Sequence, residues 1–265
     1  MIFYDSVPTA NVVAVPDVFD RVDAMPVMFQ ILPAEALDGS GFAEDAAVVS
    51  FRTYDVVRTR LQDGLTGLLV AARMARNPTT SLLGTHLLAL RAPLLAVAKG
   101  WWLTQPDEST ARVARAVDLI CADRQQGREA MLKAAKLGEM PVAREVAERF
   151  AEARQSLEAE ADRLGVAPKK TPSETAFIDN LGKQIDVYYG TYSPAIGQRD
   201  AHLLWNASSS LAHGERWFRD LTSGREMAAQ RRELAELITH RSLDVVCSGL
   251  NLLGRRTLSL ATAPG

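Results

Sequence analysis

The segment VRTRLQDGLTGLLVAARMARNP, residues 57–78, indicates the fold class of this chain. Its apolar residues recur at steps of three and four, the spacing that places side chains on one face of an α-helix. They are Val57, Leu61, Leu65, Leu68, Ala72 and Ala75. Asn77 and Pro78 follow directly, and a proline at this place predicts the end of a helix. Residues 57–77 are therefore predicted to form a long amphipathic helix.

The chain after residue 42 continues in the same way. Helical spacing with capping residues or prolines at its ends predicts helices over about 80–102, 107–138, 142–164, 174–188, 197–213 and 224–259. Pro93 lies inside the first of these and predicts a kink or a split into two pieces. No alternating period-2 pattern bounded by turns occurs, so strands are at most a minor element. We expect an all-α fold, an antiparallel bundle of about six to seven helices.

The first 41 residues have a different character. Four prolines and two glycines interrupt them, and these residues disfavour a long helix; they are Pro8, Pro16, Pro26, Pro33, Gly39 and Gly41. The sequence therefore predicts an irregular N-terminal arm over residues 1–41. Residues 42–265 are predicted to form a single helical bundle domain.

Composition excludes several classes of protein. The 265 residues carry 30 Lys and Arg against 32 Asp and Glu, a formal net charge of −2, which argues against a broadly basic nucleic-acid binder but allows a local basic patch. Two cysteines are too few for a disulfide scaffold. The sequence has no secretory signal pattern and no apolar run long enough to span a membrane, so we expect a cytoplasmic protein with no membrane partner.

One predicted helix, residues 197–213, carries an unusual stripe of polar side chains. Steps of three, four, three and four place them along one face; they are Arg199, His202, Asn206, Ser209 and His213. Ser210 lies beside the stripe, and Arg216 follows just beyond Gly214. Imidazole suits proton transfer near neutral pH, and guanidinium binds phosphate in a fork.

Three interpretations of this stripe remain open. It forms hydrogen bonds between helices or across a homodimer seam, or it binds RNA or a nucleotide, or it catalyses phosphodiester cleavage. In the last case His213 and Asn206 are the candidate catalytic residues. The candidate ligand-binding residues are Arg199, His202, Ser209, Ser210 and Arg216.

Metal or cofactor chemistry is not expected. His202 and His213 are eleven residues apart, roughly 16 Å along a helix, too far to share one ion. The sequence has no glycine-rich phosphate loop and no Gly-x-Ser-x-Gly elbow. Arg91 and Lys99 stand out on an otherwise apolar segment; each would reach solvent, pair with an acid or face the polar stripe.

Several short motifs carry a resemblance. Residues 90–92 (Leu-Arg-Ala), 101–107 (Trp-Trp-Leu-Thr-Gln-Pro-Asp) and 111–116 (Ala-Arg-Val-Ala-Arg-Ala), with a Ser-x-x-Ala-His-Gly element ending at Gly214, resemble a family of uncharacterised all-helical actinobacterial proteins. The resemblance spans roughly residues 80–220.

The histidine of that element is distantly similar to the mark of the HEPN superfamily. HEPN proteins are helical bundles, many of them metal-independent ribonucleases. Their mark is an arginine, usually followed by a polar residue, with a histidine four to six residues further on. The resemblance implies a catalytic His213 with Asn206 as a degenerate match. The chain departs from the mark because residues 206–208 are Asn-Ala-Ser and include no arginine. Arg199 and Arg216 are the neighbouring arginines that would replace it.

Overall fold

The computed structural model describes residues 17–49, 51–77, 84–138, 142–166, 171–189, 196–213 and 228–262. Of these residues 85% are helical and none lies in a strand, so the all-α prediction is confirmed. The helices are α1 (Val18–Gln30), α2 (Gly41–Ala46), α3 (Thr53–Ala75), α5 (Thr85–Thr104), α6 (Ser109–Leu137), α7 (Ala143–Arg163), α8 (Glu174–Tyr189), α9 (Ile196–His213) and α11 (Ala228–Thr262). From α3 onward each helix corresponds to one predicted from the sequence. Residues 224–227 of the last prediction lie outside the described residues.

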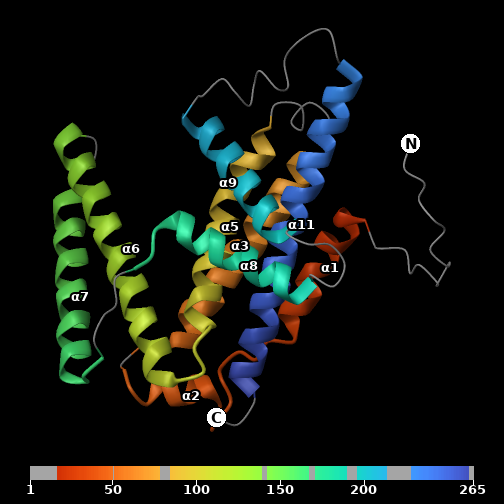
Figure 1. Ribbon diagram of the computed structural model, residues 1–265. Helices are drawn as coiled ribbons and strands as arrows, with labels where there is room; N and C mark the ends of the chain where they lie inside the picture. Colours follow the sequence, from red (N-terminus) through yellow and green to blue (C-terminus); the bar gives the residue numbers. More distant parts are fainter. Residues whose placement is uncertain are drawn as a thin grey trace.

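Helix α5 is the centre of the molecule. It packs against α3, α8, α9 and α11, and Figure 1 shows it enclosed by them. Leu87, Leu90, Leu94 and Val97 are almost completely buried there. Because α5 is apolar on nearly every side, burial by several neighbours is the arrangement its sequence requires.

Pro93 lies within α5 without dividing it. The structure has one continuous helix from Thr85 to Thr104, so the split, one of the two outcomes expected at Pro93, does not occur. Gly67 of α3 faces Pro93 so closely that a Cβ atom on Gly67 would lie 2.4 Å from the proline Cγ. The absence of a side chain on Gly67 therefore leaves the space that the proline ring occupies between α3 and α5.

The predicted irregular arm is wrong for residues 18–30, which form α1. Asp17 caps this helix by accepting a hydrogen bond from the N–H of Phe19. Val18 and Val22 are buried where α1 packs against α3 and α11, and Arg21 is ion-paired with Asp244 of α11. Tertiary burial of one face therefore outweighs the single backbone donor that Pro26 removes.

Helix α2 is the second element missing from the prediction. It begins at Gly41, where Ser40 accepts a hydrogen bond from the N–H of Ala43. Its Asp45 is completely buried against Arg112 of α6, with Arg112 Nη2 2.7 Å from Asp45 Oδ1. With α1 and α2 the described residues hold nine helices rather than the six to seven expected. Residues 1–16 of the predicted arm lie outside the described residues.

Helices α6 and α7 form a hairpin at one side of the molecule (Figure 1). Helix α7 carries two i,i+4 ion pairs, the exposed pair Glu145–Arg149 and the half-buried pair Arg154–Glu158. None of the helices in the described ranges combines the length and the apolarity needed to cross a membrane.

Candidate functional site

Helix α9, which carries the predicted stripe, is held at its first turn by α8. The carboxylate of Asp186 accepts hydrogen bonds from the backbone N–H groups of Gly197, at 2.6 Å, and Gln198, at 2.9 Å. The two helices meet so closely that a Cβ atom on Gly182 would lie 2.6 Å from the Cα of Gln198. These contacts fix the position of α9, and with it the direction of the stripe.

The first half of the stripe belongs to a network between helices. His202 Nε2 lies 3.3 Å from Oδ1 of Asp179 on α8. Hydrogen bonds to its carboxylate lower the pKa of Asp179 to about 2. The bond from Lys183 has the largest effect, and those from Gln198 and His202 add to it. Arg199 is largely exposed and pairs with the buried Asp200, at 3.3 Å.

The middle of the stripe meets α5. Nη1 of Arg91 donates a hydrogen bond of 2.6 Å to the hydroxyl of Ser209. The guanidinium carbon of Arg91 lies 4.2 Å from the centre of the Trp205 ring, which is cation–π geometry. Nη2 of Arg91 is 3.5 Å from a carboxylate oxygen of Glu174 on α8. Arg91 thus faces the polar stripe, one of the outcomes expected from its place on an apolar helix.

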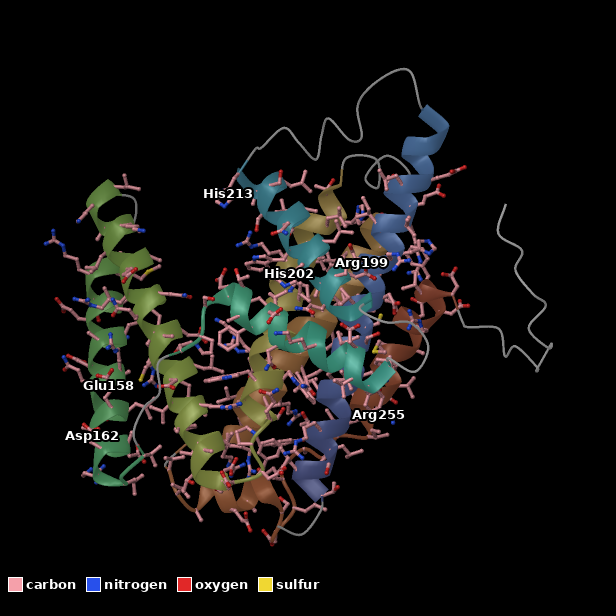
Figure 2. All side chains as sticks on the ribbon, in the orientation of Figure 1. Glu158, Asp162, Arg199, His202, His213 and Arg255 are labelled. Carbon is pink, nitrogen blue, oxygen red and sulfur yellow. The ribbon has the colours of Figure 1, made fainter. Side chains whose placement is uncertain are left out.

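The two remaining members of the stripe are open to solvent. Asn206 and His213 are exposed, and His213 occupies the last turn of α9. Figure 2 shows His213 at the opposite end of α9 from Arg199. Ser210, in contrast, is 1% exposed and faces the interior. Arg216 lies outside the described residues.

The stripe therefore divides into two parts with different chemistry. Arg199, His202 and Ser209 have protein partners, whereas Asn206 and His213 present an amide and an imidazole to solvent. We call the group of Arg91, Asn206, Ser209 and His213 the α5–α9 site. It combines a phosphate-binding side chain with one able to transfer a proton.

Arg91 is the member of the α5–α9 site that the prediction of site residues omitted. The spacing along α9 identifies the other three members because they share one helix. Arg91 is 118 residues before Ser209, and its only signal in the sequence was a charge on an apolar helix.

The remaining reactive side chains give little basis for another chemistry. Burial raises the pKa of the Cys247 thiol to about 12, and burial also raises that of Cys121, so both are held as thiols rather than nucleophilic thiolates. Within the described ranges, no three His, Cys, Asp or Glu side chains converge as metal ligands would.

Searches against models of protein families, curated proteins and solved structures found no match to this chain.

Proposed function

We propose that the α5–α9 site binds the phosphate of an RNA strand and that His213 transfers a proton in metal-independent cleavage of that strand. The observation that supports this most is the position of Arg91, fixed over Trp205 and against Ser209 in the same group as the exposed His213. Arg91 provides from α5 the guanidinium that the HEPN-like motif lacks on α9.

The chemistry suits the side chains present. An arginine guanidinium has five N–H donors arranged as a fork that matches two phosphate oxygens. His213 follows Ser209 by one helical turn, so its imidazole lies on the same face of α9 as the hydroxyl that Arg91 contacts.

The proposed reaction uses the RNA's own 2′-hydroxyl. His213 removes its proton, the 2′-oxygen attacks phosphorus, and the bond from phosphorus to the 5′-oxygen breaks. The departing 5′-oxygen takes a proton from water, and the hydroxide that remains takes the proton from His213, which restores the neutral imidazole. The products are a cyclic phosphate and a 5′-hydroxyl. Arg91 and Asn206 would hold the phosphate oxygens during the attack.

A non-catalytic interaction module is the second candidate function. It is favoured by the first half of the stripe, where His202 pairs with Asp179 as a purely structural network would. Under either function, the homodimer through this face and the antiparallel course of the long helices stay predictions. Sedimentation of the purified chain measures the first of these.

RNA cleavage in the presence of EDTA separates the two functions. We expect the wild-type chain to cut a single-stranded RNA, and His213→Ala to lose cleavage while its RNA affinity changes by less than about threefold. His240→Ala is the matched control because His240 is also an exposed helix histidine, on α11 against Phe19. Cleavage that survives His213→Ala, or a wild-type chain that does not cut RNA, contradicts the catalytic proposal.

A further inference from the structure

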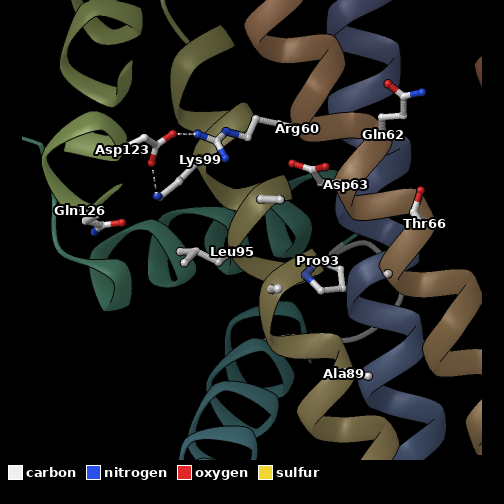
Figure 3. Close-up of a pocket in the computed structure, with 13 residues that line it drawn as sticks. Arg60, Gln62, Asp63, Thr66, Ala89, Pro93, Leu95, Lys99, Asp123 and Gln126 are labelled. Carbon is white, nitrogen blue, oxygen red and sulfur yellow. Dashed lines mark hydrogen bonds and ion pairs between the residues drawn. The ribbon is translucent and has the colours of Figure 1, made fainter. Parts of the chain in front are cut away.

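A cavity of about 730 Å³ lies between α3, α5 and α6, away from α9. Figure 3 shows Lys99, Arg60 and Asp123 grouped at one part of it, with Pro93 and Ala89 farther along α5. The volume is within the range of small-molecule sites in proteins. None of the four residues of the α5–α9 site lines it.

Two cations meet one carboxylate in this cavity. The Lys99 side chain is only 11% exposed and the Arg60 side chain 18%. Both pair with Asp123 of α6, Lys99 Nζ at 3.2 Å from Oδ1 and Arg60 through Oδ2. Lysine is seldom so buried, and burial of a charge is unfavourable unless a partner compensates it. Asp123 offsets one of the two positive charges, and the exposed Asp63 on α3 is the second carboxylate of the lining.

The two cations also have more hydrogen-bond donors than Asp123 accepts. An ammonium has three N–H donors and a guanidinium five. The Asp123 carboxylate accepts one hydrogen bond from Lys99 and one from Arg60. The donors that remain suit a second anionic group, one brought by a ligand.

The rest of the lining is mostly apolar along α5. Ala92, Pro93, Leu95 and Ala96 contribute aliphatic surface beside the two cations. Such a wall binds a hydrocarbon body, whereas the cations bind a charged head. Asp63, exposed on α3, adds a negative charge to the lining and therefore disfavours polyanions.

We propose that this cavity binds an amphipathic organic monoanion, a carboxylate on a short aliphatic body. The carboxylate accepts hydrogen bonds from Lys99 and Arg60 beside Asp123, and the aliphatic body lies along Pro93 and Leu95. This site shares no residue with the α5–α9 site, so each of the two proposals can be tested independently of the other.

The test is a titration of the ¹⁵N-labelled chain with octanoate, followed by NMR. We expect saturable shifts of the backbone amides of residues 89–99, and octanamide, which lacks the charge, to bind at least about tenfold more weakly. Inorganic phosphate, which lacks the aliphatic body, is expected to bind more weakly than octanoate. Equal affinities for octanoate and octanamide, or shifts confined to other helices, overturn the proposal.

Three variants locate the binding. Lys99→Gln is expected to weaken octanoate binding about tenfold or more, and Arg60→Gln replaces it as the test if the lysine variant does not fold. Asp123→Asn is expected to strengthen octanoate binding severalfold because it removes the competing carboxylate. Tighter binding in this variant is not expected if Lys99, Arg60 and Asp123 only stabilise the fold. Lys183→Gln, at an exposed lysine of α8, is the matched control and leaves the affinity unchanged. Unchanged affinity in Lys99→Gln, or weaker binding in Asp123→Asn, overturns the proposal.

Discussion

Arg112 and Arg91 lie on adjacent long helices and meet very different surroundings. Arg112 is 1% exposed, and each of its five N–H donors has a protein acceptor: the Asp45 carboxylate and the carbonyls of Gly41, Pro106 and Asp107. The Arg91 side chain is 28% exposed, hydrogen-bonded to Ser209 and near Glu174. A guanidinium whose donors are all used by the protein stabilises the fold, whereas one with donors toward solvent is available to a ligand.

Removal of the Asp45 carboxylate tests the role of the buried Arg112 and has the largest expected effect on stability. Asp45→Ala leaves the Arg112 charge buried without its carboxylate, and we expect the free energy of unfolding to fall by about 3–5 kcal/mol. Urea denaturation measures it. A loss below about 1 kcal/mol would show that the ion pair of Arg112 with Asp45 does not stabilise the packing of α2 against α6.

The close contact of α8 with α9 gives the next largest effect. Gly182→Ala places a methyl group against the backbone of Gln198, which cannot move aside as a flexible side chain can. We expect a loss of about 1–3 kcal/mol in thermal unfolding. Gly127→Ala on α6 is the matched control, because its new methyl group meets only the tip of the Phe150 ring; an equal loss in both variants contradicts this account.

Acid tests the network at the first half of the stripe. The folded chain holds the pKa of Asp179 at about 2, below its ordinary value of 3.8, because Lys183, Gln198 and His202 favour the ionised carboxylate. This contribution to stability is therefore present above pH 4 and lost as the pH falls from about 4 to about 2. It is about 1 kcal/mol after allowance for solvent screening.

Asp179→Asn measures that contribution. Unfolding at pH 5 is expected to show the variant less stable than wild type, and the difference should shrink at pH 2.5. A difference that stays constant between the two pH values would show that the Asp179 charge does not take part.

The exposed pair on α7 has the smallest expected effect. Glu145→Ala removes a partner of Arg149 where both side chains are well exposed, so we expect a loss of about 0.3–0.5 kcal/mol in urea denaturation. A loss of stability in Glu145→Ala as large as that in Asp45→Ala would contradict this account, because an exposed ion pair would then contribute as much as the buried pair of Arg112 with Asp45.

Sequence patterns predicted the helices from α3 to α11 because each carries its own apolar period and end signals. They did not predict α1, since Pro26 indicates a break and the burial of Val22 under α11 is a property of the folded chain. The spacing of Asn206, Ser209 and His213 on one face was predictable for the same local reason. The pairing of Ser209 with Arg91 was not, because it depends on how α5 packs against α9.

The most direct test of phosphate binding by Arg91 is a titration of the ¹⁵N-labelled chain with uridine 3′-monophosphate. We predict that the side-chain signals of Arg91 and His213 shift together and saturably, and that Arg91→Gln weakens binding about tenfold or more while Arg149→Gln does not. Unmoved Arg91 and His213 signals, or equal affinity in wild type and Arg91→Gln, would contradict the proposal that this arginine binds phosphate.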